Sequence, residues 1–192
     1  MSYQIYTTQA LILKRIPYDA NVSYLLYTKD FGLISALATG VRKSESKLRY
    51  ALQEYSLIDI SLVKGRSTWR ITSAILEKNL FTSTKYREAK AVIARICTQV
   101  MRLVVGQEKD ERLFESLVCG LRELTVCNRT EISSLEILIM IRMLYILGYV
   151  SDVEGAVCSV PYTYDTSVYI HIESSRSLFI QHINKGLQES QL

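Results

Sequence analysis

The sequence has little glycine or proline, and it lacks a long apolar run. With 8 Gly and 2 Pro in 192 residues, it contains no collagen-like or low-complexity segment. The longest apolar stretch, residues 135–147, is interrupted by Glu136 and Arg142, whereas a membrane span needs about 20 apolar residues. Residues 1–9 lack a basic segment followed by an apolar one, so no secretory signal is expected. These absences predict a soluble protein of the cytoplasm.

The sequence also has few residues at spacings that would bind a metal or form a disulfide. The four cysteines have no short paired spacing, as expected of a reduced intracellular protein; they are Cys97, Cys119, Cys127 and Cys158. The two histidines, His171 and His182, have only Glu173 near them at a ligand-like spacing. We therefore expect no metal site and no cofactor.

Motifs of enzyme chemistry are missing as well. The chain has no phosphate-binding P-loop, no GxGxxG and no nucleophile elbow. The acidic residues of the first 80 positions are scattered, with no pair of aspartates spaced to hold Mg²⁺ for nuclease chemistry. The sequence favours a binding protein over an enzyme, and we assign no catalytic residue.

Positive charge is concentrated at the N-terminal end. The net charge is +4, but residues 1–80 carry 11 Lys/Arg against 6 Asp/Glu, whereas residues 151–192 carry 2 against 5. A positive field of this kind steers an anionic partner toward the first 80 residues. Ordinary solubilising charge is the alternative that composition alone leaves open.

Residues 1–80 have the two-residue hydrophobic period of strands. Five segments rich in Ile, Val, Leu, Tyr and Thr are separated by turn signals; they are residues 5–14, 23–28, 33–38, 55–63 and 68–75. Five short strands suit a small Greek-key barrel such as an OB-fold. The connection between the third and fourth strands, residues 40–54, is unusually rich in charge.

Beyond residue 80 the period becomes that of helices. We expect a helix from Ser83 or Thr84 to about Val105, a second capped by Asp110, and a third capped by Thr130 and closed by Gly148. The third is apolar nearly all round and should form the centre of its bundle. In residues 151–192, Ser167–Ile172 alternates like a strand that Leu178–Ile180 could pair with, and Gln188–Leu192 resembles a frayed end. The predicted fold is α+β, with an OB-fold barrel (1–80), a helical domain (81–150) and a small C-terminal appendage (151–192).

The basic residues of the predicted barrel suit a nucleic acid. OB barrels bind single strands by combining cationic loops with aromatic rings on which bases stack. The candidate DNA-binding residues are Lys14, Arg15, Arg42, Lys43, Lys47, Arg49, Lys64, Arg66 and Arg70. Possible stacking rings are Tyr24, Tyr27, Tyr50, Tyr55 and Trp69, although a role in the core is the commoner one for such residues.

Five ordered blocks of this sequence resemble the RecO family of bacterial recombination and repair proteins. They are residues 10–20, 25–34, 38–53, 55–64 and 144–152, the last containing Leu147-Gly148-Tyr149. The resemblance covers roughly residues 5–155 in the family's order. The resemblance implies an N-terminal OB-fold joined to a helical domain, and a function as a recombination mediator. Such proteins bind single- and double-stranded DNA, anneal complementary strands, pair with RecR and contact single-strand-binding protein, so that RecA is loaded onto coated DNA.

The sequence departs from the family at one point. Many members carry a zinc module of four cysteines after the central helix. Here residues 155–158 resemble its first CxxC with only Cys158 kept, and no cysteine follows. Because one thiolate cannot close a tetrahedral site, we expect the module to be degenerate and free of zinc.

Four arginines of the helical domain could hold a protein partner. They lie beside large apolar faces, which suits an anchor and carboxylate clamp for the acidic tail of single-strand-binding protein; they are Arg95, Arg102, Arg112 and Arg122. Two other readings remain open, a general OB-fold binder of RNA or tRNA and an adapter whose barrel docks an acidic protein. We expect a cytoplasmic, nucleoid-associated DNA-binding protein without a membrane partner.

Overall fold

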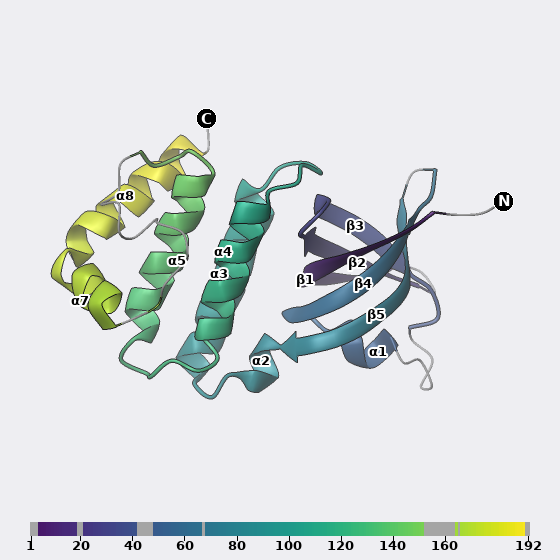
Figure 1. Cartoon of the computed structure of the whole chain (residues 1–192), viewed down its shortest axis with the longest axis horizontal. Helices are drawn as coiled ribbons and strands as arrows, with labels where there is room; N and C mark the ends of the chain where they lie inside the picture. Colours follow the sequence, from purple (N-terminus) through teal and green to yellow (C-terminus); the bar gives the residue numbers. More distant parts are fainter. Residues whose placement is uncertain are drawn as a thin grey trace. The chain divides into compact units, whose positions relative to one another are not determined.

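A computed structural model describes residues 4–18, 21–41, 48–66, 68–151, 164 and 166–190. Five strands form a closed barrel in the order β1-β2-β3-β5-β4 (Figure 1). They are β1 (Ile5–Tyr18), β2 (Asn21–Thr28), β3 (Gly32–Ala38), β4 (Ser56–Lys64) and β5 (Trp69–Asn79). All pairs are antiparallel except β3–β5, which is parallel. This order and this closure identify an OB-fold, as the strand pattern predicted.

The barrel core follows from the alternation along each strand. Every second side chain points inward, and these residues are buried; they include Ala10, Ile12, Val22, Tyr24, Leu26, Ile34, Ala36, Ile58, Ile60, Leu62 and Trp69. Each large aliphatic side chain buried in this way contributes about 1.5 to 3 kcal/mol. All five predicted strands are confirmed.

Strand β1 is longer than predicted and carries a bulge. The register with β2 shifts between Ile12 and Lys14, which changes the side of the strand on which the following residues lie. The strand then continues through Pro17, which pairs with Val22, beyond the predicted end at residue 14. Proline lacks an N–H to donate and is accepted near the end of a strand.

The charged connection between β3 and β4 contains a short helix that the sequence did not predict. This helix, α1 (Leu48–Ala51), carries Arg49 and Tyr50 on its exposed side and buries Ala51. Its four residues are too few to show a helical period. The predicted DNA-binding residues Arg42, Lys43 and Lys47 lie outside the described residues.

The segment after α3 (Arg87–Leu103) packs on the barrel. The chain divides into two compact units, and residues 97–111 belong with residues 1–83 in the first, the barrel unit. The Leu33 amide donates to the Gly106 carbonyl over 3.3 Å. Asp30 accepts hydrogen bonds from the Thr8 hydroxyl, over 2.7 Å, and from the Lys109 ammonium, over 3.2 Å. Polar contacts therefore join this segment to the β2–β3 hairpin.

We expect Asp30→Asn to weaken the barrel unit in a pH-dependent way. The hydrogen bond from Thr8, helped by Lys109, holds the pKa of Asp30 below its usual range. A carboxylate with a lowered pKa stabilises the fold above its unfolded-state pKa and loses that effect as it is protonated. The variant should lose up to about 1 kcal/mol near neutral pH, since the site is partly solvent-screened. The difference should shrink as the pH falls through the lowered pKa.

Urea unfolding of both proteins at neutral and strongly acidic pH measures this effect. Asp59→Asn, which changes an exposed carboxylate on β4, is the matched control. A loss of stability at Asp30 that is equal at both pH values would contradict the prediction.

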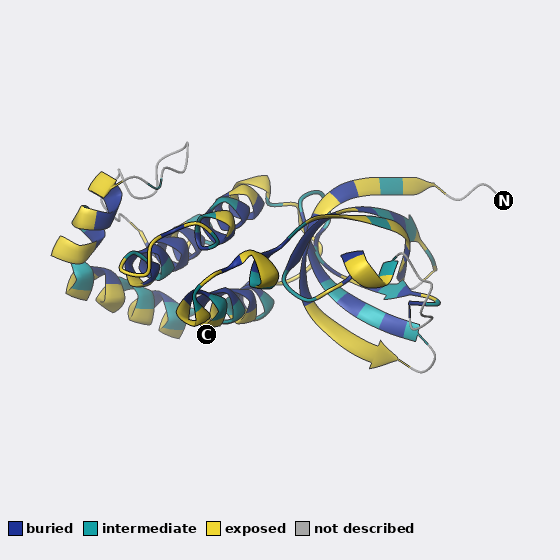
Figure 2. Ribbon diagram, turned by 90° about the horizontal axis from the view of Figure 1, so that it is seen from below, coloured by how far each residue is buried: buried dark blue, intermediate teal, exposed yellow. Residues whose placement is uncertain are grey.

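The second unit, the helical unit, comprises residues 84–96 and 112–192. Its elements include α4 (Glu111–Glu123), α5 (Ile132–Ile146), α7 (Thr166–Ser174) and α8 (Arg176–Glu189), with Glu111 itself in the barrel unit. Helix α5 is buried at almost every position from Ile132 to Leu144, which confirms that the helix apolar on all sides is a core helix (Figure 2). Gly148 has a φ of 79°, as predicted for the end of this helix.

Two of the predicted helix starts were wrong. Ser83 ends a separate short helix, α2 (Leu80–Ser83), and α3 begins only at Arg87. The residue before α5 is Glu131 rather than Thr130, because the Glu131 amide donates to the Asn128 carbonyl in a preceding turn. The second helix starts directly after Asp110, as expected.

The C-terminal prediction of strands was also wrong. Residues 166–174 form α7, and residues 176–189 form α8, so Gln188 and Glu189 are helical. Val168, Tyr169 and Ile172 are buried, whereas Ile170 is 65% exposed. This is the spacing of one helical face rather than the alternation of a strand. Helices α7 and α8 both pack against α5.

Among the described residues, no helix is both long and apolar enough to cross a membrane.

Candidate nucleic-acid interface

Two of the predicted basic residues line a groove of the barrel unit. A hollow of about 430 Å³ is formed by Arg15, Tyr24, Val41, Arg49 and Gln53. A second, of about 360 Å³, is formed by Arg15, Pro17, Gln53 and Glu54. The two hollows share Arg15 and Gln53, so they adjoin, and we call them together the α1 groove. Its volume is in the range of ligand sites.

The bulge in β1 places Arg15 at this groove. After the bulge, Arg15 pairs with Tyr24 of β2, and paired residues lie on the same face of a sheet. Tyr24 is fully buried, and its hydroxyl has no hydrogen-bond partner of good geometry. Burial raises the pKa of Tyr24, while the nearby Arg15 guanidinium partly opposes the rise. The guanidinium therefore lies against the wall formed by Tyr24.

One acidic residue lies among these cations. A carboxylate oxygen of Glu54 accepts a hydrogen bond from the Arg15 backbone N–H over 2.8 Å. This bond fixes β1 against the start of β4. Among the described lining residues, two guanidinium groups against one carboxylate leave the α1 groove positive.

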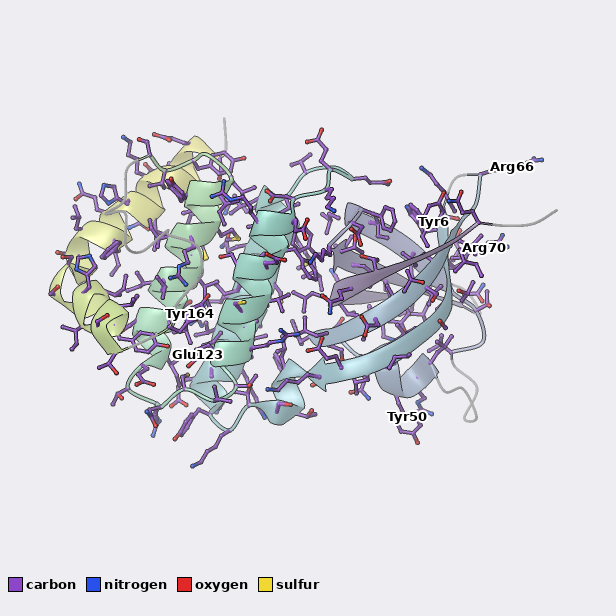
Figure 3. The ribbon with its side chains drawn as sticks, in the orientation of Figure 1. Tyr6, Tyr50, Arg66, Arg70, Glu123 and Tyr164 are labelled. Carbon is purple, nitrogen blue, oxygen red and sulfur yellow. The ribbon has the colours of Figure 1, made fainter. Side chains whose placement is uncertain are left out.

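A second group of predicted cations surrounds the β4–β5 hairpin. Lys64 and Trp69 pair in register, and the Lys64 ammonium lies 5.5 Å from the centre of the Trp69 ring. Arg66 is exposed in the turn, and Arg70 is exposed on the outer face of β5 (Figure 3). The turn is closed by a 2.9 Å hydrogen bond from the Gly65 amide to the Thr68 carbonyl. Three cations thus lie on the β4–β5 hairpin.

Lys14 is exposed on β1 next to Arg15. Because neighbouring residues of a strand point to opposite faces, Lys14 lies on the outer face of the barrel and not in the α1 groove. The sequence placed these two cations together, whereas the strand separates them.

Most of the predicted stacking rings are part of the packing. Tyr24, Tyr27 and Trp69 are at most 5% exposed. Tyr55 stacks on Phe81 with ring centres 4.2 Å apart. Tyr50 is the exception, since it is 73% exposed and extends from α1 away from the barrel (Figure 3). The sequence analysis did not single out Tyr18, which is 59% exposed.

The four arginines proposed for a protein partner are all exposed, but they differ in their surroundings. Arg102 belongs to the barrel unit, and the other three belong to the helical unit. Arg95 makes a bidentate ion pair with Glu136, with distances of 2.7 and 2.8 Å, and this contact raises the pKa of Arg95. The guanidinium group of Arg95 is thus already bound to a carboxylate within the helical unit.

The helical unit buries a further arginine. Arg142 is fully buried, and its guanidinium carbon lies 4.7 Å from the centre of the Tyr164 ring. The Tyr164 hydroxyl donates a 3.4 Å hydrogen bond to the Ser116 carbonyl. The burial of Arg142 against Tyr164 was not predicted from the sequence, because Arg142 is a charged residue in a largely apolar helix.

Within the part of the chain that the structure describes, no three His, Cys, Asp or Glu side chains come together as metal ligands. Cys158, on which the prediction of a degenerate zinc module rests, lies outside that part.

Comparison with known proteins agrees with the barrel and its position in the chain. The family model "Recombination protein O N terminal" matches residues 1–80. The DNA repair protein RecO of Chlorobium limicola is 28% identical over 158 residues, which are 81% of this chain and 60% of that protein. RecO of Chlorobium phaeobacteroides is 34% identical over 125 residues, or 62% and 47% of the two chains. RecO of Rubrobacter xylanophilus is 28% identical over 114 residues, or 59% and 46%.

The fold and these matches define the chain as an OB-fold protein with an appended helical unit. Residues 1–80 match the N-terminal part of the RecO family, and the chain is similar in sequence to RecO proteins. The chain spans between 46% and 60% of the length of these three relatives.

Proposed function

We propose that this chain is a non-enzymatic DNA-binding protein of recombination and repair. It binds single- and double-stranded DNA through its barrel, anneals complementary strands and, with RecR, helps to load RecA onto DNA coated by single-strand-binding protein. It acts in the cytoplasm at the nucleoid.

The observation that carries the proposal is the positive α1 groove on an OB barrel. Arg15 and Arg49 line it, although they are 34 residues apart in the chain. Guanidinium groups recognise phosphate oxygens with two parallel hydrogen bonds. The β4–β5 hairpin carries three further exposed cations, Lys64, Arg66 and Arg70. Phosphate contacts of this kind hold DNA without reading its sequence, as annealing of any complementary pair requires.

The arginines of the helical unit and Arg102 are the proposed contacts for single-strand-binding protein. Exposed arginines beside apolar side chains suit an acidic tail with an apolar end. Of these arginines, Arg95 also makes the ion pair with Glu136.

Strand annealing with two labelled complementary oligonucleotides tests the proposed function. We expect the protein to accelerate annealing, and Arg15→Ala combined with Arg49→Ala to reduce the rate roughly tenfold or more, since each charge-assisted contact contributes about 1.5 to 3 kcal/mol. Lys85→Ala with Arg87→Ala removes the same charge from exposed positions of the helical unit and should leave the rate unchanged. Repeating the reaction with single-strand-binding protein and RecR tests the partners. Annealing at the spontaneous rate would refute the proposal.

A further inference from the structure

The first hollow of the α1 groove has a buried hydroxyl in its wall. Tyr24 lines this hollow, although the residue is fully buried and belongs to the barrel core. Among the residues that the structure describes, the Tyr24 hydroxyl has no hydrogen-bond partner. Because a buried hydroxyl without a partner destabilises a fold, such a group in the wall of a hollow points to a hydrogen-bonding ligand.

Other hydrogen-bond donors share the hollow with this hydroxyl. Arg15, Arg49 and Gln53 line it, and all three are exposed. The Arg15 guanidinium lies beside the Tyr24 hydroxyl, where it partly opposes the rise in the pKa of Tyr24 that burial causes. With its pKa raised, Tyr24 keeps its proton near neutral pH and can donate it to an acceptor. The lining thus directs two cations and two neutral donor groups toward one anion.

We propose that this hollow binds a phosphate monoester, which the end of a DNA strand supplies. The proposal rests on the DNA-binding function proposed above and adds to it a preference for phosphorylated ends. A monoester carries a charge of about −1.5 to −2 near neutral pH and has three terminal oxygens that accept hydrogen bonds. A phosphodiester within a strand has a single charge and two such oxygens. Two guanidinium groups and a hydroxyl donor therefore match the monoester better.

The adjoining hollow favours the end of a strand over its middle. Glu54 lines that second hollow together with Arg15, and the Glu54 carboxylate is held there by the Arg15 backbone N–H over 2.8 Å. A strand that passed through both hollows would bring its next phosphate toward this carboxylate, which repels it. A strand that ends in the first hollow avoids the repulsion. Free inorganic phosphate has the same chemistry as a strand end, and the test separates the two sources.

The test compares single-stranded oligonucleotides of one sequence by fluorescence anisotropy at fixed salt. They carry a phosphate at the 5′ end, at the 3′ end or at neither end. The wild type should bind at least one of the phosphorylated strands tenfold or more tightly than the unphosphorylated strand. Tyr24→Phe should remove most of this preference, because it deletes only a hydroxyl that donates to a charged group. Its binding of the unphosphorylated strand should change less than twofold.

Tyr27→Phe is the matched control. Tyr27 is similarly buried on β2 but lies three residues from Tyr24 and thus on the opposite face of the strand, so this variant should keep the wild-type preference. A second variant, Gln53→Glu, places a carboxylate at an exposed position of the hollow and should also remove the preference. Thermal unfolding checks that each variant is folded, and Gln53→Glu decides the matter if Tyr24→Phe is not.

The outcomes separate this site from DNA binding in general. Equal binding of all three strands by the wild type, or a preference that both hollow variants retain, would overturn the site for strand ends and leave DNA binding intact. Inorganic phosphate, added at constant ionic strength, tests the other source. If it stabilised the wild type but not Tyr24→Phe against thermal unfolding, and no strand were preferred, the role of the strand end would be refuted. Failure of the wild type to bind any strand would instead refute the proposed function.

Discussion

Gly32→Ala should destabilise the barrel unit by roughly 2 to 4 kcal/mol, as the sum of a backbone penalty and a steric one. Gly32 has a φ of 61°, a conformation that costs other residues about 1 to 2 kcal/mol. A Cβ at this position would lie 2.4 Å from the carbonyl oxygen of Glu108 and 3.0 Å from its amide nitrogen. Since these are backbone atoms, relief requires movement of the segment that holds the Leu33–Gly106 hydrogen bond.

Gly40→Ala is the matched control for this substitution. Gly40 has a similar φ of 70°, but among the described residues nothing lies within 4 Å of the position that its Cβ would occupy. The control measures the backbone penalty alone, and the difference between the two variants measures the close approach of Glu108. Urea unfolding midpoints, compared at constant m-value, give both quantities. If Gly32→Ala were no less stable than Gly40→Ala, the segment would not pack on the hairpin in this way.

The strands of the barrel could be predicted because their signals are local. Alternation of apolar residues and turn residues between them are visible within eight or ten positions. The same rule failed at Val168, Ile170 and Ile172, which alternate as a strand would but form a helix. Burial of Tyr169 instead of Ile170 shows that the packing of α7 on α5 decided the structure. Helix α1 was missed because its four residues, Leu48–Ala51, are too few to show a helical period.

Only the chemical types of the candidate site residues could be predicted from the sequence, and not their arrangement. The types and rough positions of the cations were visible in the sequence, but the meeting of Arg15 with Arg49 depends on closure of the barrel and on the bulge before Lys14. The sequence also could not predict which aromatic rings are exposed. Tyr24 and Tyr50 each have one polar and one apolar neighbour in the sequence, and yet Tyr24 is buried and Tyr50 is exposed. Non-local contacts decide such differences.

Replacing Arg42, Lys43, Lys47 and Arg49 together by alanine should greatly reduce the salt dependence of DNA binding. Each phosphate of a single strand that a cation neutralises contributes about 0.7 to the slope of log affinity against log salt. If three or four of these residues contact phosphates, the slope should become shallower by roughly 2 to 3 units. Arg49, the member that the structure describes, is exposed and lines the α1 groove. Fluorescence anisotropy across a salt series measures the slope.

The loss should be similar for every DNA sequence, because phosphate contacts position a strand without reading its bases. Removing the same number of cations elsewhere, with Lys85, Arg87, Lys90 and Lys185 changed to alanine, lowers the net charge equally but should leave the slope almost unchanged. This comparison separates direct contacts from the general field of the protein, which acts on both variants alike. Unfolding free energies of exposed charge variants should stay within about 0.5 kcal/mol of the wild type. An unchanged slope in the first variant would mean that this connection does not bind DNA, and the hairpin cations Lys64, Arg66 and Arg70 would then have to provide the phosphate contacts.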